Sequence, residues 1–249
     1  GSKMVNGIIS GLGRVGHSLK SGTEVIPSGI TGGSTIRYRT PSIGGLILAA
    51  SYTPETDVDP IGDEIDGNGD GKSVAEDVWS LAARYTSTYG AYTTTVYVGY
   101  EQGNRTLKEE TGLHDGHHNS IFYSVGARVS TESADFAAGY GERRADTNFA
   151  GGLPDDDYRW FDVAAAYTFG PWAVSGGVGY LVRDDEDFIG DPNVDQKMFA
   201  ASLSAQLRLA PGLSIKTGIT VWEIENADSD GKNVDNDATT FTLTTEMSF

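Results

Sequence analysis

The residues at the end of the chain alternate between two kinds of side chain. One face is largely apolar, and the other carries small polar residues with a single acid, Glu246. This period of two predicts a β-strand with one apolar and one polar face. The apolar face consists of Thr239, Phe241, Leu243, Thr245 and Met247, and the strand ends at Phe249.

The same alternation recurs along the chain and predicts eleven strands, most of them about 10 residues long, as a tilted strand that crosses a bilayer requires. The polar faces carry small side chains and few charges, unlike an ordinary exposed surface. Apolar residues outward and small polar residues inward are typical of a transmembrane β-barrel. We therefore predict an all-β, antiparallel, up-and-down transmembrane barrel, with strands in residues 34–41, 46–52, 79–85, 92–100, 121–129, 136–140, 161–169, 172–180, 199–209, 213–221 and 239–249.

The predicted connections alternate in length. Short ones fall at Pro41–Gly45, Thr88–Ala91, Thr131–Ser133, Gly170–Pro171 and Ala210–Gly212, and long polar ones fall at 54–76, 103–118, 145–157, 184–195 and 225–237. Short turns on one side of the membrane and long loops on the other are typical of outer-membrane barrels. If Phe249 lies at the periplasmic rim, the long loops are external.

Composition narrows the choice of function. The chain has 249 residues, no Cys, a mean hydropathy of -0.30 and a formal net charge of -17. Acids gather in the predicted loops, with nine in residues 55–77 and six in residues 184–195. Such a surface repels phosphates and argues against a nucleic-acid partner. Gly1 and Ser2 look like a cloning scar, so residues 1–6 are assigned to a tag, a linker or the start of the chain.

Two segments resemble general bacterial porins. The run STIRYRTPSIGGLILAASYTPE at 34–55 is similar to their hairpin of an Arg-Tyr strand, a tight turn with Pro, a Gly-Gly pair and an alternating strand. The ending TTEMSF resembles the terminal strand that the outer-membrane insertion machinery recognises. The resemblance implies a sixteen-stranded homotrimeric porin in the bacterial outer membrane, in contact with its lipid. It also implies that residues 7–33 form a constriction loop and residues 34–249 the barrel strands.

Eleven is an odd number, whereas single-chain bacterial barrels have even counts. Residues 3–13 could supply a twelfth strand. We favour the other explanation, in which the first five strands of a porin are absent and a second polypeptide completes the barrel. Residues 7–33 contain many Gly residues and no sustained alternation, which is typical of a loop rather than a strand.

Several charged residues are candidates to line the pore. The alternation places Arg37, Arg39, Arg84 and Arg128 on the polar face. An Arg on the lipid face would cost roughly 2–4 kcal/mol at the midplane of the bilayer, so these should face the lumen. Arg143 and Arg183 are expected at the water interface instead. If residues 14–30 fold inward as the constriction, the candidates to face the pore there are Arg14, His17, Lys20 and Glu24.

The acidic segment at 55–77 contains a candidate calcium site. Asp66, Asn68 and Asp70, followed by Gly71, match the start of a calcium-binding loop, in which oxygens at alternate positions converge on the ion. The motif has Glu at its twelfth position, where this chain has Asp77. The alternative is an acidic loop that is solvated and binds no ion. We predict no required cofactor, with calcium as the candidate ligand.

We predict a passive diffusion pore for small hydrophilic solutes and ions. Nothing in the sequence specifies the oriented nucleophile and base that an enzyme needs, so no catalytic residue is assigned. The alternatives are a non-conducting outer-membrane barrel that serves as an adhesin, receptor or autotransporter translocator, and a soluble β protein.

Overall fold

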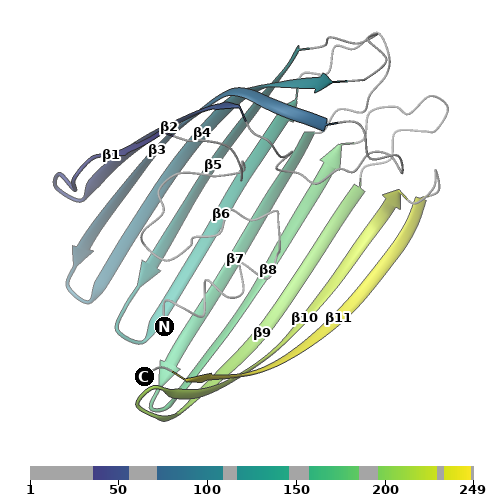
Figure 1. Cartoon of the computed structure of the whole chain (residues 1–249). Helices are drawn as coiled ribbons and strands as arrows, with labels where there is room; N and C mark the ends of the chain where they lie inside the picture. The colour runs from purple at the N-terminus through teal and green to yellow at the C-terminus, as the bar shows by residue number, and fades with distance from the viewer. Residues whose placement is uncertain are drawn as a thin grey trace.

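The computed structural model describes residues 36–55, 72–108, 117–145, 157–184, 196–228 and 233–247. Eleven strands form one antiparallel sheet in which each strand pairs with the next along the chain (Figure 1). The predicted all-β, up-and-down architecture with eleven strands is therefore confirmed. No helix in these residues is long and apolar enough to cross a membrane. The strands are β1 (Ile36–Arg39), β2 (Leu46–Glu55), β3 (Lys72–Tyr89), β4 (Tyr92–Lys108), β5 (His117–Ser130), β6 (Ala134–Ala145), β7 (Asp157–Phe169), β8 (Trp172–Asp184), β9 (Gln196–Ala210), β10 (Leu213–Asp228) and β11 (Asn233–Met247).

Short turns join alternate pairs of strands and lie at one end of the sheet, as the alternation of connection lengths predicts (Figure 1). Gly90 joins β3 to β4 with a φ of 58°, a left-handed conformation that favours glycine. Gly45 also has positive φ, and an added Cβ there would collide with the backbone carbonyl of Thr86. Because Met247 pairs with Leu213 just after a short turn, β11 finishes at this same end.

The strands extend further than the side-chain pattern predicts. β3 has 18 residues, β4 has 17 and β10 has 16, whereas the alternation predicts about 10. Most of the connection predicted at 225–237 is paired strand, since β10 runs to Asp228 and β11 starts at Asn233. The prediction was wrong here because backbone pairing continues in water, where neither face needs apolar side chains.

Burial alternates along each central strand and defines two faces. In β7, Trp160, Asp162 and Ala164 are buried, whereas Phe161 and Ala165 between them are exposed. We call the face with Trp160 the inner face and the face with Phe161 the outer face. Directly paired residues of antiparallel strands share a face, so the register assigns each described residue of the eleven strands to one of the two.

The inner face is concave, and side chains from different strands converge on it. The Trp160 ring on β7 reaches across Gly141 on β6 and stacks on Phe122 on β5, with 5.2 Å between ring centroids. On the outer face, large apolar side chains diverge and remain about 40–60% exposed, including Leu81, Val98 and Leu203. Apolar side chains therefore point outward and polar ones inward, as the alternation predicts.

The described sheet has two edges. β1 pairs only with β2, and β11 pairs only with β10, so the described strands do not close into a ring. Several predictions lie outside the described residues: segments 1–6 and 7–33, the strand alternative at 3–13, the pore candidates Arg14, Lys20 and Glu24, and the calcium candidates Asp66, Asn68 and Asp70.

Candidate functional site

The outer face carries aromatic residues in two rows near the ends of an apolar band. On three strands the two rows are eight residues apart, at Tyr92 and Tyr100, Phe161 and Phe169, and Trp172 and Tyr180. At about 3.3 Å per residue this spacing is about 26 Å along a strand, before tilt is considered. Such rows at the two borders of an apolar band are typical of a membrane-spanning barrel, where aromatic rings lie at the lipid–water interfaces.

Near the long connections, charged residues form hydrogen bonds with the tyrosine hydroxyls of the aromatic row. The hydroxyls of Tyr123 and Tyr140 both donate to Oε2 of Glu142, and the Tyr140 bond is 2.7 Å long. Arg144 Nε donates to Oε1 of the same carboxylate at 2.6 Å. On β2, the Tyr52 hydroxyl likewise donates to Asp77 at 2.6 Å. These bonds satisfy the polar ends of rings whose bodies lie on apolar surface.

The inner face contains most of the charged groups that lie between the two aromatic rows. Among the described side chains this face holds seven bases and four acids. Its sign is therefore opposite to that of the whole chain, whose net charge is -17. The bases are Arg37, Arg39, Arg84, Arg128, Arg143, Arg208 and Lys216, and the acids are Glu101, Asp135, Asp162 and Glu246.

Three of the predicted pore residues lie together on β1–β3. Arg37 pairs with Ser51 and Arg39 pairs with Ala49, while Arg84 pairs with Ile47 on the other edge of β2. All three thus share the inner face. Arg37 and Arg39 are exposed and Arg84 is half-buried. The register brings them together across one strand, although more than 40 residues separate Arg39 from Arg84 in sequence.

The fourth predicted pore residue, Arg128, is held by an acid. Its Nη2 and Nε lie 2.7 and 2.9 Å from Oδ1 of Asp135 on the neighbouring strand. The Asp135 side chain is 7% exposed and that of Arg128 is 16% exposed. The pair is fixed near the short-turn end of the inner face, and its net charge is zero. Asp135 and Asp162 were not predicted, although both occupy inner positions of their strands.

Arg143 lies in a buried cluster rather than at an exposed water interface, which corrects the prediction for this residue. Arg143 is only 7% exposed, and its guanidinium carbon lies 5.8 Å from the centroid of the Tyr158 ring. Glu101, also 7% exposed, accepts a 2.6 Å hydrogen bond from Ser80 and is attracted electrostatically to Arg143. Tyr158 on β7 lies directly beside Arg143 on the concave face, which helps to cover it. The side chain of Arg183 lies outside the described part of the structure.

A further ion pair lies near β11, where Lys216 and Glu246 are 2.6 Å apart. Two ion pairs of the inner face are thus Arg128–Asp135 and Lys216–Glu246. In the described part of the chain, no cluster of three or more His, Cys, Asp or Glu side chains could hold a metal ion.

Comparison with known proteins gives one family match. The family model described as Gram-negative porin matches residues 6–227 of this chain. That match includes the whole of the segment 7–33. No curated protein sequence matches.

Solved structures share the fold at low sequence identity. The in-vitro folded trimer form of OmpT, an outer membrane protein of Vibrio cholerae, aligns with a TM-score of 0.57 at 12% identity and covers 89% of this chain and 66% of that chain. Outer-membrane expressed OmpT of Vibrio cholerae aligns with a TM-score of 0.54 at 12% identity and covers 86% and 64%. An anion-selective porin from Comamonas acidovorans aligns with a TM-score of 0.57 at 13% identity and covers 86% and 58%. The chain therefore spans less than two thirds of the length of each of these proteins.

Proposed function

Because this chain belongs to the Gram-negative porin family, we propose that it forms the wall of a water-filled pore in the bacterial outer membrane. Small hydrophilic solutes and ions would diffuse passively through that pore. One observation carries the proposal: the apolar side chains and aromatic rows cover the outer face, while the charged side chains between those rows lie on the concave inner face. A soluble protein has no reason to place its apolar side chains on the convex surface.

The charges of the inner face support a preference for small anions. Fixed charges along a lumen select ions by their sign, because every ion that crosses a narrow pore passes close to them. Bases outnumber acids on the described inner face, and three of them, Arg37, Arg39 and Arg84, form one group. We propose that this group lines the lumen and attracts anions. The proposed constriction by residues 7–33, with Arg14, Lys20 and Glu24 facing the pore, would act beside it.

The proposal extends to how the barrel is completed and assembled. A sheet edge cannot stay unpaired in lipid, so β1 and β11 need further strands beside them, from this or a second polypeptide. We propose a homotrimer that contacts outer-membrane lipid through the outer face. The trimer is supported by the similar OmpT structure, which is described as a trimer form.

Single-channel recording tests the function. The refolded protein is added to a planar lipid bilayer, and stepwise, ohmic conductance is expected. Protein that inserts without any conductance steps would contradict the pore and favour a non-conducting barrel. The reversal potential in a salt gradient then reports the preference between anions and cations. Protein that does not enter bilayers or detergent micelles at all would instead indicate a soluble protein.

A further inference from the structure

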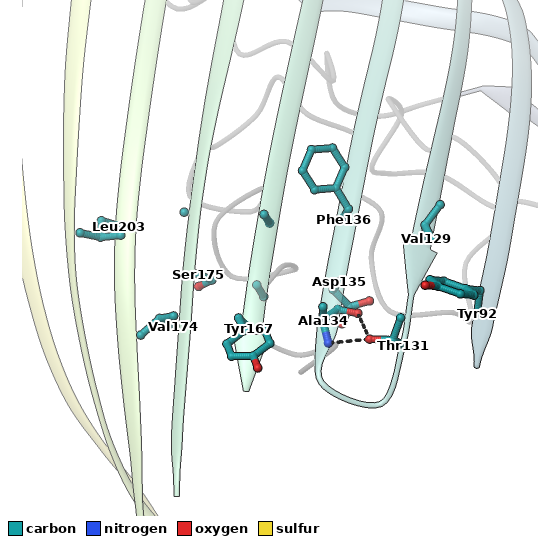
Figure 2. Close-up of a pocket in the computed structure, with 13 residues that line it drawn as sticks. Tyr92, Val129, Thr131, Ala134, Asp135, Phe136, Tyr167, Val174, Ser175 and Leu203 are labelled. Atoms are coloured by element: carbon teal, nitrogen blue, oxygen red, sulfur yellow. Dashed lines mark hydrogen bonds between the residues drawn. The ribbon is translucent and has the colours of Figure 1, made fainter. Parts of the chain in front are cut away.

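The outer face contains an apolar groove near the short-turn end of the sheet (Figure 2). The groove has a volume of about 460 Å³ and runs over β4–β9. Its lining side chains on the outer face carry no charge, and the carboxylate of Asp135, which also belongs to the lining, is paired with Arg128 on the inner face. It therefore differs from the inner face, where the charged groups gather.

The shape of the groove follows from one row of paired residues. Phe136, Ala165, Gly176 and Leu203 lie side by side on β6, β7, β8 and β9. Phe136 and Leu203 stand on either side and are 60% and 62% exposed. Ala165 and Gly176 between them have almost no side chain and form the floor. With about 4.8 Å between strands, the two ridges start about 14 Å apart.

One end of the groove lies at the aromatic row of the short-turn end. Tyr92 and Tyr167 line this end, and their rings combine an apolar body with a polar hydroxyl (Figure 2). The backbone of the nearby turn is satisfied internally, since Thr131 N donates to Ala134 O at 2.7 Å and Ala134 N donates to Thr131 Oγ1 at 2.9 Å. The polar residues among the lining are Thr131, whose hydroxyl bonds within the turn, Asp135 and Ser175, which belong to the inner face, and the two tyrosines.

We infer that this groove is a binding site for an acyl chain of a membrane phospholipid in the leaflet on the short-turn side. The inference rests on the proposed function in one respect, namely that the outer face contacts the bilayer. An acyl chain is flexible and apolar, so it can fill the groove. Its ester group would then lie at the level of Tyr92 and Tyr167. In lipid, where no hydrophobic effect favours one apolar surface over another, such binding depends on close van der Waals packing.

A lipid fits this groove better than a second copy of the chain does. The outer surface of another barrel is convex and stiff, so it would touch the ridges at Phe136 and Leu203 and leave the floor empty. A methylene chain bends into the recess and contacts Ala165 and Gly176 directly. The groove is also continuous with the apolar band between the two aromatic rows, which acyl chains surround in a bilayer.

Native mass spectrometry of the full chain tests the inference. The protein is refolded into vesicles of palmitoyl-oleoyl-phosphatidylethanolamine, extracted with detergent, washed and analysed for retained phospholipid. Two variants fill the floor, Ala165→Leu and Gly176→Val. A Cβ at Gly176 would have only ordinary contacts, at 3.5 and 3.6 Å from Ser202 O and Leu203 Cδ1, so this variant is expected to fold. Ala127→Leu enlarges another exposed alanine of the outer face that does not line the groove, and serves as the control.

The wild type and Ala127→Leu are expected to retain phospholipid after washing, while both groove variants lose it. Equal retention by all four proteins, or none in the wild type, would overturn the inference. A trimer that the groove variants abolish, without any phospholipid in the wild type, would assign the groove to a second copy and also overturn it. Conductance is recorded on the same samples. A conducting wild type that retains no lipid rejects only the groove, whereas a non-conducting wild type that retains lipid rejects only the pore.

Discussion

The indole ring of Trp160 lies over Gly141, its direct neighbour on the adjacent strand. A Cβ added at Gly141 would overlap the six-membered ring of Trp160. This arrangement lets Trp160 reach Phe122 two strands away and stack on it. A glycine in the middle of a strand is therefore what allows an aromatic pair to span three strands of the inner face.

Gly141→Ala is expected to destabilise the barrel by about 1–3 kcal/mol, because the ring must move and the stack on Phe122 is lost. Urea unfolding in lipid vesicles measures the change in the free energy of unfolding. Gly176→Ala is the matched control, since an added Cβ there makes only ordinary contacts. Equal stability of the two variants would show that the wall repacks around the added methyl group without loss.

The Arg128–Asp135 pair is expected to couple energetically, because both side chains are largely buried on the inner face. A double-mutant cycle with Arg128→Gln and Asp135→Asn should give an interaction energy of roughly 0.5–3 kcal/mol. The Lys216–Glu246 pair is the comparison: its side chains are 34% and 48% exposed, and exposed pairs contribute about 0–1 kcal/mol. A smaller coupling for the buried pair than for the exposed pair would contradict this expectation.

Neutralising Arg37, Arg39 and Arg84 together to Gln is expected to shift the reversal potential toward cation preference. The reason is that the lumen would lose its group of three bases while its acids remain. Arg144→Gln serves as the control, because Arg144 lies on the outer face and pairs with Glu142. An unchanged reversal potential in the triple variant would remove these three residues from the pore lining.

The orientation of the barrel can be tested with single cysteines, since the chain contains no Cys. Glu225→Cys lies at the end of the sheet that carries the long connections. Ser133→Cys lies in a short turn at the opposite end, and both positions are exposed. If the long connections are external, a maleimide on a large polymer should label only Glu225→Cys on intact cells. Ser133→Cys should react only after the outer membrane is permeabilised. The reverse pattern would show that the short turns are external.

Calcium is expected to raise the unfolding midpoint if Asp66, Asn68 and Asp70 bind it, because a ligand that binds only the folded state stabilises that state. These residues lie outside the described part of the structure, so the site is a prediction from the sequence. The variant Asp66→Asn with Asp70→Asn should lose the response to calcium. A wild-type melting curve that neither calcium nor a chelator changes would reject a stabilising site.

Much of the fold could be predicted because a strand has a fixed period. In β7 the order of Phe161, Asp162 and Val163 by itself separates an outward ring, an inward acid and an outward aliphatic side chain. This local rule gave the strand number, the short turns and the inner placement of Arg37, Arg39, Arg84 and Arg128. It did not give the strand ends, such as Lys72 and Asp228, because pairing beyond the membrane leaves no alternating pattern to detect.

The sequence by itself determined which face of each strand is polar, because side chains alternate along any β-strand and only one face can meet lipid. Only the tertiary structure decided which residues meet across strands. Register and curvature bring Arg128 to Asp135, Arg143 to Tyr158 and Trp160 to Phe122, and they leave a groove where Ala165 and Gly176 become neighbours. These contacts depend on the pairing register between strands and on side chains that converge on a concave face, and neither follows from the alternation within one strand.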